Sequence, residues 1–470
     1  MELITTTYNN FENKILKTLE TNGVISRPHA SSGLWLGPLI GLCAIVTLLN
    51  EDNSYSEICL LVGITGVGLI MSSICLIIQL SIDKSASKDF QVLYFLPASM
   101  MSMLYLLWAK KGLLVSVSWG LSVGSLGTWG VLQVMSQFPK CFTLGEAITV
   151  THGIVLFLLS SGTNFPLRYH LPPLHDDDIA TAILQVGIIF VGLLCISCAF
   201  YPKIRTTKYF YLTTVGLLLI FVAPLLHILL DQSPLLWTIY YIFGTQRRVF
   251  LIIYWAICLL VGACVIAYQI LSQSHATTAG RKCFHCLAVI VYLPGMLYEP
   301  TLLYLASGVI MGLFIILELM RLLKVSPIGE VLELGFSGFS DEKDLLISLS
   351  PLYLHVGLSF PLWMPTSSLK LLPLLSGIIT IGIGDTAASI IGSKLGKNKW
   401  PNSNKSIEGT IACISSQLIF IYGLAFFGLV PGWWTLVKST MAVIGVSLIE
   451  ALTDQIDNLT LPFLFYLWSI

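Results

Sequence analysis

Charged side chains are scarce in this sequence: Lys, Arg, Asp and Glu together make up only 11% of its 470 residues. Soluble domains carry about 25% charged residues, whereas 55% of this chain is hydrophobic. This composition excludes a soluble globular protein and predicts a polytopic membrane protein. An excess of one sign is also missing, because 25 basic residues balance 25 acidic ones. That balance argues against a nucleic-acid partner.

Two further features are missing from the sequence. Residues 1–33 are polar and lack the apolar core of a signal peptide, so we expect the first membrane span itself to direct insertion. The 11 cysteines are scattered and mostly lie in apolar runs, which indicates buried thiols rather than a disulfide framework. Cys283 and Cys286 form a C-x-x-C pair. A structural zinc site needs four ligands, and no second pair lies nearby in the sequence, so this pair does not predict a zinc site.

Apolar runs long enough to cross a bilayer recur about fifteen times. They lie at approximately 34–50, 57–81, 90–108, 112–135, 145–162, 178–200, 209–230, 249–271, 282–298, 301–322, 345–364, 370–391, 409–429 and 433–450, and from 459 onward. The sequence therefore predicts an all-α polytopic membrane helical bundle of about 15 transmembrane spans. We divide it into an N-terminal multi-span region, 1–271, and a C-terminal membrane-embedded catalytic region, 272–470.

The most informative stretch is 382–410, which reads GIGDTAASIIGSKLGKNKWPNSNKSIEGT. Asp385 lies in an apolar run, where an acid is costly and usually functional. Ala388, Gly392 and Gly396 follow at helical spacing, so one helix face carries an acid and exposed backbone. Small residues at this spacing are, on their own, also typical of close helix packing.

Basic and polar residues follow this helix in a loop that Pro401 interrupts. They are Lys394, Lys397, Lys399, Lys405, Ser406, Glu408 and Gly409. An acid, exposed backbone and clustered ammonium groups predict a metal-bound polyphosphate site at the membrane edge. The segment is not a P-loop, because Gly392 and Gly396 enclose three residues and Asn398 stands where Ser or Thr is needed.

The distribution of charge along the chain predicts the membrane side of this site. If the spans alternate, most Lys and Arg residues fall on one side, which should be cytosolic. Four polar segments of the second half share that side: 281–282, 321–344, 392–408 and 450–457. Their convergence on one face is what an active site requires. A cytosolic loop would also leave the sequon at Asn404 unglycosylated.

Two smaller groups of polar residues are open to two interpretations. Arg281 and Lys282 stand where a span begins, as topology anchors do, and His285 lies one turn further inside. Glu318 and Arg321 are three residues apart, so they can pair on one helix face. A structural ion pair and a substrate clamp are equally compatible with that spacing.

Several of these residues resemble the nucleotide-binding signature of the CTP-dependent polyprenol kinases, which include dolichol, phytol and CTP-dependent diacylglycerol kinases. The signature residues are Gly384, Asp385, Ala388, Gly392, Gly396, Lys405, Ser406, Glu408 and Gly409. Arg281, Lys282 and His285, and Glu318 with Arg321, extend the resemblance. Within the group, the long N-terminal half and the segments 138–147 and 341–353 are similar to the dolichol kinases.

The resemblance implies transfer of the terminal phosphate of CTP to the primary hydroxyl of dolichol, for protein glycosylation at the endoplasmic reticulum membrane. It implies a nucleotide site that includes Lys394, Lys397 and Lys399 beside the signature residues. Asp385 and Glu408 are the expected ligands of a divalent cation, Mg²⁺. Either Asp385 or His285 would orient or deprotonate the alcohol, while Arg281, Lys282, Glu318 and Arg321 are further candidates.

Three alternatives remain at this point. The protein could be another CTP-dependent lipid kinase, acting on phytol or diacylglycerol. It could be a lipid cytidylyltransferase, which releases pyrophosphate instead of CDP. A transporter would use the intramembrane acids as ion sites, although the sequence lacks the matching broken segments of two repeated halves. The choice of CTP over ATP depends wholly on the resemblance.

Overall fold

The computed structural model describes residues 2–51, 57–82, 92–170, 175–271, 278–336, 346–366, 370–401 and 403–470. Every regular element in these ranges is a helix. Among the same residues, extended backbone pairs at an isolated bridge between Lys399 and Ser406. The predicted all-α class is confirmed.

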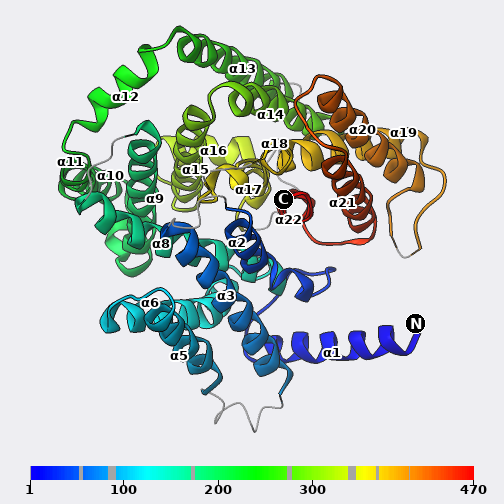
Figure 1. The fold of residues 1–470 in the computed structure, drawn as a ribbon, viewed down its shortest axis with the longest axis horizontal. Helices are drawn as coiled ribbons and strands as arrows, with labels where there is room; N and C mark the ends of the chain where they lie inside the picture. Colours follow the sequence, from blue (N-terminus) through cyan, green and yellow to red (C-terminus); the bar gives the residue numbers. More distant parts are fainter. Residues whose placement is uncertain are drawn as a thin grey trace.

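The first part of the chain, up to residue 271, forms helices that wind around the lower, left and upper parts of the molecule in Figure 1. They are α1 (Glu2–Thr21), η1 (Leu34–Leu36), α2 (Leu39–Leu49), α3 (Glu57–Ser81), α5 (Val92–Leu107), α6 (Leu113–Ser125), η2 (Leu126–Gly130), α7 (Val131–Gln137), α8 (Leu144–His170), α9 (Asp176–Phe200), η3 (Pro202–Arg205), α10 (Thr207–Leu217), η4 (Leu218–Val222), α11 (Ala223–Leu230), α12 (Pro234–Phe243) and α13 (Gln246–Leu271).

The second part continues through shorter and more irregular helices. They are α14 (Thr278–Tyr298), α15 (Pro300–Leu322), α16 (Ile328–Phe336), α17 (Leu349–Trp363), α18 (Leu371–Leu374), η5 (Ile378–Asp385), α19 (Thr386–Leu395), α20 (Ile407–Phe426), α21 (Trp433–Leu452) and α22 (Asp457–Ser469). Whether residue 271 separates two domains stays a prediction.

Nine of the helices in the described ranges are long and apolar enough to cross a membrane. Helices suit this role because they satisfy their own backbone groups where water is absent. Four shorter apolar helices begin at Leu34, Phe95, Pro234 and Lys282. The protein is thus an all-helical, multi-pass membrane protein, while the predicted count of about fifteen spans is not confirmed. Residues 234–243 were not among the predicted spans.

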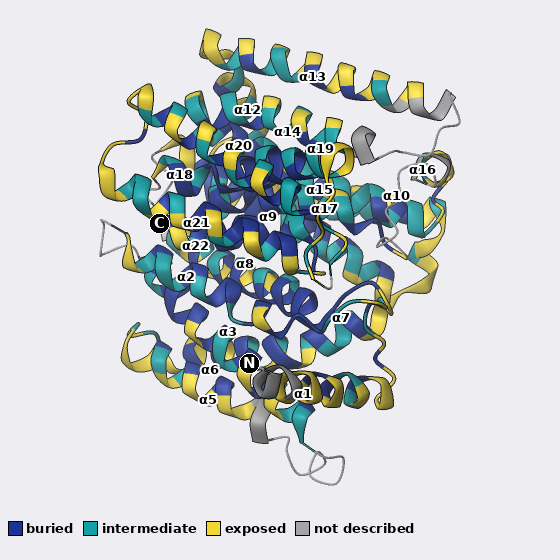
Figure 2. Cartoon of the chain, turned by 90° about the vertical axis from the view of Figure 1, so that its right-hand side faces the viewer, coloured by how far each residue is buried: buried dark blue, intermediate teal, exposed yellow. Residues whose placement is uncertain are grey.

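One core cluster joins both parts of the chain. It contains Leu39 of α2 and Phe465 of α22, and α22 packs against α2, α17, α21 and η5. Figure 1 shows α22 near the centre of the bundle, while α1 projects from it. Figure 2 shows buried residues concentrated in the middle and exposed residues along α13 at one edge. Exposed apolar side chains such as Phe250 and Ile257 on α13 suit contact with lipid.

The irregular helix η5 is a π-helical stretch that ends at Asp385. Two glycines let neighbouring helices approach it closely. A Cβ atom on Gly382 would collide with Val289 of α14, and one on Gly384 would collide with Gln417 of α20. The Gln417 amide also donates to the hydroxyl of Ser447 on α21, at 3.2 Å. The close packing at these glycines brings α14 and α20 next to Asp385, and the Gln417–Ser447 bond brings α21 there as well.

Candidate active site

Asp385 is buried at the junction of η5 and α19, and two basic residues of α14 face it. The Lys282 ammonium group donates to Oδ2 of Asp385, and Nδ1 of His285 lies 3.3 Å from the same oxygen. A buried carboxylate is tolerated where a cation pairs with it. The structure thus brings Lys282 and His285, both predicted from the sequence, into contact with Asp385, which lies about a hundred positions further along the chain.

Lys405 lies in the loop before α20, and it contacts the last turn of α21 and the first residue of α22. Its ammonium group donates to the Glu450 carboxylate and, at 2.7 Å, to the Glu450 carbonyl oxygen. It also lies 3.2 Å from Oδ2 of Asp457. Burial lowers the pKa of Lys405, but the charges of Asp457 and Glu450 outweigh this and raise the pKa above its ordinary value. The ammonium group therefore stays charged at neutral pH.

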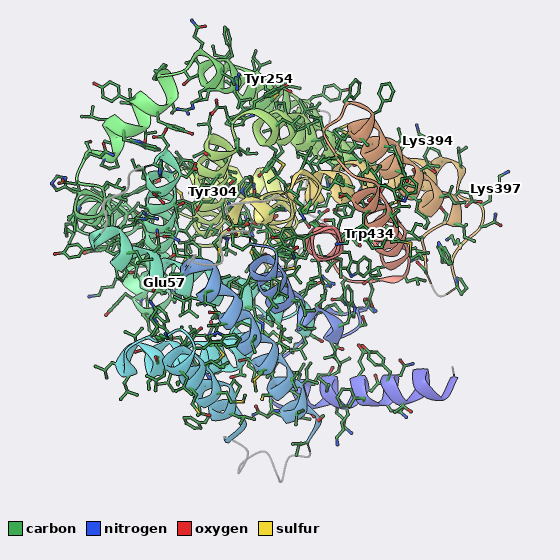
Figure 3. The ribbon with its side chains drawn as sticks, viewed as in Figure 1. Glu57, Tyr254, Tyr304, Lys394, Lys397 and Trp434 are labelled. Carbon is green, nitrogen blue, oxygen red and sulfur yellow. The ribbon has the colours of Figure 1, made fainter. Side chains whose placement is uncertain are left out.

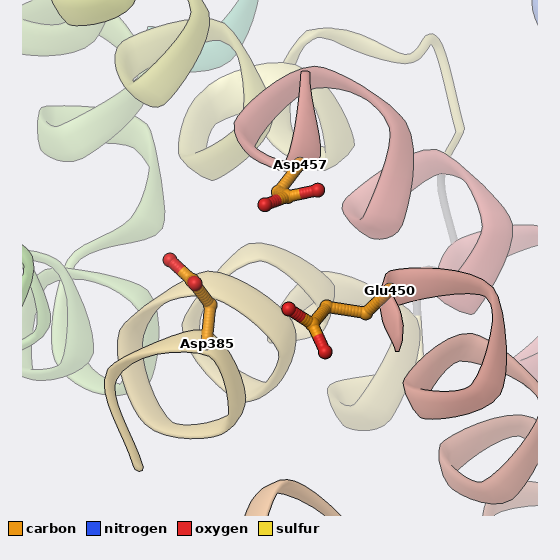
Figure 4. Close-up of side chains that lie close together, drawn as sticks. All are labelled: Asp385, Glu450 and Asp457. Atoms are coloured by element: carbon orange, nitrogen blue, oxygen red, sulfur yellow. The ribbon is translucent and has the colours of Figure 1, made fainter. Parts of the chain in front are cut away.

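Three carboxylates converge beside these cations. Figure 4 shows Asp385, Glu450 and Asp457 facing one another from η5, the end of α21 and the start of α22. One oxygen from each lies within 4.8 Å of the others. Among the described residues, Oδ1 of Asp457 is buried without a hydrogen-bond partner. Oxygen ligands in such a cluster suit a hard divalent cation.

Glu450 and Asp457 had no individual role in the sequence analysis, although the segment 450–457 was expected on the same face. The signal for Glu450 was present, because it ends an apolar run and is buried, as is Asp385. The predicted convergence of 392–408 and 450–457 is confirmed by the contacts of Lys405. The sequence could not predict how close Glu450 and Asp457 lie to Asp385 in space.

Glu408 organises the loop before α20. Its carboxylate accepts hydrogen bonds from the backbone N–H and the side-chain amide of Asn398, at 3.2 and 2.9 Å. The Ser406 hydroxyl caps the same helix by accepting from the Gly409 N–H at 3.1 Å. Glu408 lies outside the group of three carboxylates found among the described residues. Its predicted role as a metal ligand stays a prediction.

The small residues of α19 pack against the start of α20. A Cβ atom on Gly409 would lie 2.9 Å from the Ala388 carbonyl oxygen, and one on Gly392 would lie 3.0 Å from the Ser406 hydroxyl. A Cβ atom on Gly396 would collide with Ser406 as well. These glycines therefore serve close helix packing. Ala388, Gly392, Gly396 and Gly409 also line the site cavity, so both interpretations of this strip apply.

The four predicted lysines lie in different places. Lys405 and Lys399 line the cavity. Lys394, in the last turn of α19, and Lys397, just after that helix, are exposed, and Figure 3 shows Lys397 at the outer edge of the molecule. Lys399 is exposed as well, and the structure separates two lysines that line the cavity from two that lie outside it.

Glu318 and Arg321 form the ion pair that their spacing allows, with Nη2 of Arg321 2.7 Å from Oε1 of Glu318. Glu318 also accepts from the Ser348 N–H at 2.9 Å, and Arg321 donates to the Leu346 carbonyl oxygen at 2.9 Å. The pair therefore fixes the entry into α17. The Arg281 side chain and the predicted segment 341–344 lie outside the described residues.

One cavity of about 1200 Å³ unites the charged groups with apolar space. At one part it is lined by Lys282, His285, Asp385, Lys399, Lys405, Glu450 and Asp457. Elsewhere its walls are apolar side chains of α13, α14 and α17, including Leu259, Leu287, Ala288, Val291, Leu354 and Leu358. Ligand pockets are usually about 300–1,000 Å³, so this cavity has room for a polar group and an apolar chain together.

These features define a multi-pass helical membrane protein with a charged site that is continuous with an apolar cavity. The sequence profile of the dolichol kinase family matches residues 121–345. A dolichol kinase of Arabidopsis thaliana is 30% identical over 392 residues, which are 74% of this chain and 68% of that protein. One of Schizosaccharomyces pombe is 30% identical over 374 residues, 72% of this chain and 70% of that protein. The chain belongs to the dolichol kinase family, as its sequence predicted.

The mammalian relatives are somewhat more similar but are matched over less of their length. The dolichol kinase of Mus musculus is 33% identical over 350 residues, or 69% of this chain. The chain spans 64% of the length of that protein and of its Homo sapiens counterpart. No solved structure matches this chain.

Proposed function

We propose that this protein is a dolichol kinase, which transfers the terminal phosphate of CTP to the primary hydroxyl of dolichol and yields dolichyl phosphate and CDP. The observation that carries the proposal is the single cavity in which Lys282, Asp385 and Lys405 adjoin apolar walls. A polyprenol needs both environments, because its hydroxyl must meet a polyphosphate while its chain stays out of water. The relatives named dolichol kinase support the same acceptor.

Phosphoryl transfer depends on positioning and on charge neutralisation more than on covalent help from the protein. Lys282, Lys399 and Lys405 line the cavity and would neutralise phosphate oxygens. Asp385 is held by Lys282, which leaves His285 as the group that accepts the hydroxyl proton. The His285 ring lies beside Asp385, and this contact would orient the ring toward the alcohol.

The residues present fit a divalent cation. Asp385, Glu450 and Asp457 offer three oxygens within 4.8 Å of one another, and Mg²⁺ prefers carboxylate oxygens together with substrate phosphates. We assign the cation to these three residues, in place of the sequence-based pair of Asp385 and Glu408. When bound, Mg²⁺ supplies charge neutralisation at the transferred phosphate.

The nucleotide and the cellular location are proposed from the sequence. The resemblance of residues 384–409 to the CTP-dependent polyprenol kinases supports CTP as the donor. The charge distribution supports a site that faces the cytosol, and the family resemblance supports the endoplasmic reticulum membrane. The chain would cross the membrane thirteen times if the four shorter apolar helices of the described ranges also span it beside the nine long ones, which is two fewer than the predicted count of about fifteen.

The test is incubation of purified protein with dolichol, Mg²⁺ and labelled CTP or ATP, followed by analysis of lipid and nucleotide products. We expect labelled dolichyl phosphate and CDP from CTP. Asp385→Asn should lower the rate at least about a hundredfold, which is the scale of losing an electrostatic partner of the transition state. Asp176→Asn, an exposed acid at the start of α9, is the matched control and should keep full activity.

Three outcomes would contradict the proposal. Equal labelling from ATP would refute CTP as the specific donor. Release of pyrophosphate instead of CDP would identify a cytidylyltransferase. Turnover that survives in Asp385→Asn would remove this carboxylate from the site.

A further inference from the structure

A buried ion pair lies in the N-terminal half, next to the charged site. Glu146 of α8 is 0% exposed and Arg27 is 5% exposed, and Nη2 of Arg27 lies 2.8 Å from Oε1 of Glu146. Burying two charges is costly unless their remaining hydrogen-bonding capacity is satisfied. Part of that capacity is used on another segment, although Nη1 of Arg27 is buried without a partner among the described residues. Oε1 of Glu146 accepts from the Ile456 N–H at 3.1 Å, and Arg27 donates to the Asp454 carbonyl oxygen at 3.3 Å.

The neighbouring residues bind the same segment. Gln455 is fully buried, and its Oε1 accepts from the Thr143 hydroxyl at 2.6 Å. The Gln455 amide donates to the Ser31 carbonyl oxygen at 3.1 Å. The Asp454 carboxylate accepts from the N–H and the hydroxyl of Ser31, each at 2.6 Å. Burial raises the pKa of Asp454, but these bonds outweigh it and hold the pKa below its ordinary value.

Two glycines allow the backbone to pack so closely here that a side chain at either position would collide with a neighbour. Gly33 has φ of +67°, a conformation that suits glycine, and a Cβ atom there would lie 2.5 Å from Oε1 of Gln455. A Cβ atom on Gly145 would collide with the Gly33 carbonyl oxygen. The loops before α2 and α8 are thus packed directly against residues 453–456.

Residues 453–456 connect two of the carboxylates in the charged site. Glu450 lies at the end of α21, and Asp457 is the first residue of α22. Ile456, whose N–H donates to Glu146, immediately precedes Asp457. Displacement of this connection would move Asp457 relative to Lys405 and Asp385. The sequence motif 138–147, for which the proposed reaction itself has no use, supplies both Thr143 and Glu146.

We propose that Glu146 is a positioning residue, which acts with Arg27 and Thr143 to hold the connection 453–456 so that Asp457 faces Asp385 and Glu450. The N-terminal half thereby becomes a structural part of the phosphoryl-transfer site. This inference rests on the proposed function in one respect, since it takes Asp457 as a ligand of the divalent cation.

The test compares Glu146→Ala with Glu299→Ala in the full-length protein. Glu299 belongs to a second, partly buried Arg–Glu pair, with Arg248 at 3.0 Å. Hydrogen exchange measured by mass spectrometry should rise in residues 453–458 of Glu146→Ala and stay unchanged there in Glu299→Ala. Mn²⁺ titration, followed by electron paramagnetic resonance, should show half-saturation at about tenfold higher metal concentration in Glu146→Ala, the usual effect of losing a residue that orients a ligand.

Thr143→Val is the second variant, because it keeps the side-chain shape and removes the two bonds of the hydroxyl, one donated to Gln455 and one accepted from the Glu146 N–H. It should also raise exchange in 453–458, and kcat should fall while KM for dolichol stays constant. Unchanged exchange in 453–458 of either folded variant would overturn the positioning role. An equal rise of exchange throughout the chain would overturn it as well. If the wild-type protein binds no Mn²⁺, the metal assignment fails, and hydrogen exchange still decides the role of Glu146.

Discussion

At the scale of single residues, the site depends on the pairing of buried opposite charges. Lys282 pairs with Asp385, and Lys405 pairs with Glu450 and Asp457. Removing one partner of such a pair leaves an uncompensated charge and is more harmful than removing both. Lys282 and Lys405 are therefore expected to matter for the position of the carboxylates as well as for the phosphate.

Lys405→Gln should lower kcat/KM for the nucleotide at least about a hundredfold, because an electrostatic partner is lost and two carboxylates are left unpaired. Lys397→Gln is the control, since Lys397 is exposed and points outward (Figure 3). Its kcat/KM should stay within about twofold of wild type, as expected for a screened surface charge. Equal losses in the two variants, measured as CTP-dependent labelling of dolichol, would show that the outer lysines also contact the nucleotide.

Those site residues whose chemistry is unusual for their surroundings can be recognised in the sequence. Asp385 was found because an acid is costly inside an apolar run. The same rule applies to Glu450, but the sequence alone could not bring a residue 65 positions away to Asp385. Asp457 lies in a polar segment where acids are ordinary. Its importance emerges only from the contact with Lys405.

At the scale of helices, the contact between α19 and α20 sets the geometry of the loop that carries Lys399 and Lys405. The contact depends on Gly392 and Gly409, where an added Cβ atom would lie against backbone atoms of the other helix. Small residues allow this approach, and dispersion contacts then stabilise it. Sequence spacing predicted the packed strip, whereas the π-helical turns of η5 before it had no signal in the pattern of apolar residues.

Gly409→Ala should destabilise the protein by about 1–3 kcal/mol, as overpacking does, because the new methyl group would lie 2.9 Å from the Ala388 carbonyl oxygen. It should also lower activity by displacing the loop. Gly423→Ala lies in the same helix with nothing within 4 Å of the added atom. That control should be neutral or gain about 0.5–1 kcal/mol, the helix preference for alanine. Thermal unfolding in detergent measures both, and equal destabilisation would refute the packing argument.

At the scale of the whole molecule, apolar run length predicted where most helices lie but not how many cross the membrane. The predicted run 57–81 matches Glu57–Ser81, and 301–322 matches Pro300–Leu322 within one residue. The run 345–364 was predicted to be a membrane span, but the helix found there, α17, has 15 residues and is largely buried in protein. A buried helix and a spanning helix can be equally apolar. Their distinction requires knowledge of what surrounds each helix.

The cavity makes a final prediction about the acceptor lipid, because its apolar walls come from helices of both parts of the chain. Ala288→Trp places a large ring among the apolar lining residues and should raise KM for dolichol at least about tenfold, the value of roughly two buried methylene groups. A short isoprenoid alcohol reaches the charged site without filling that space, so its KM should change far less. Ala267→Trp, on an exposed face of α13, is the control and should change neither the KM for dolichol nor the KM for the short alcohol.

An equal rise in KM for the long and the short alcohol would mean that the ring in Ala288→Trp disturbs the charged site itself. An unchanged KM for dolichol would place the lipid chain elsewhere among the helices.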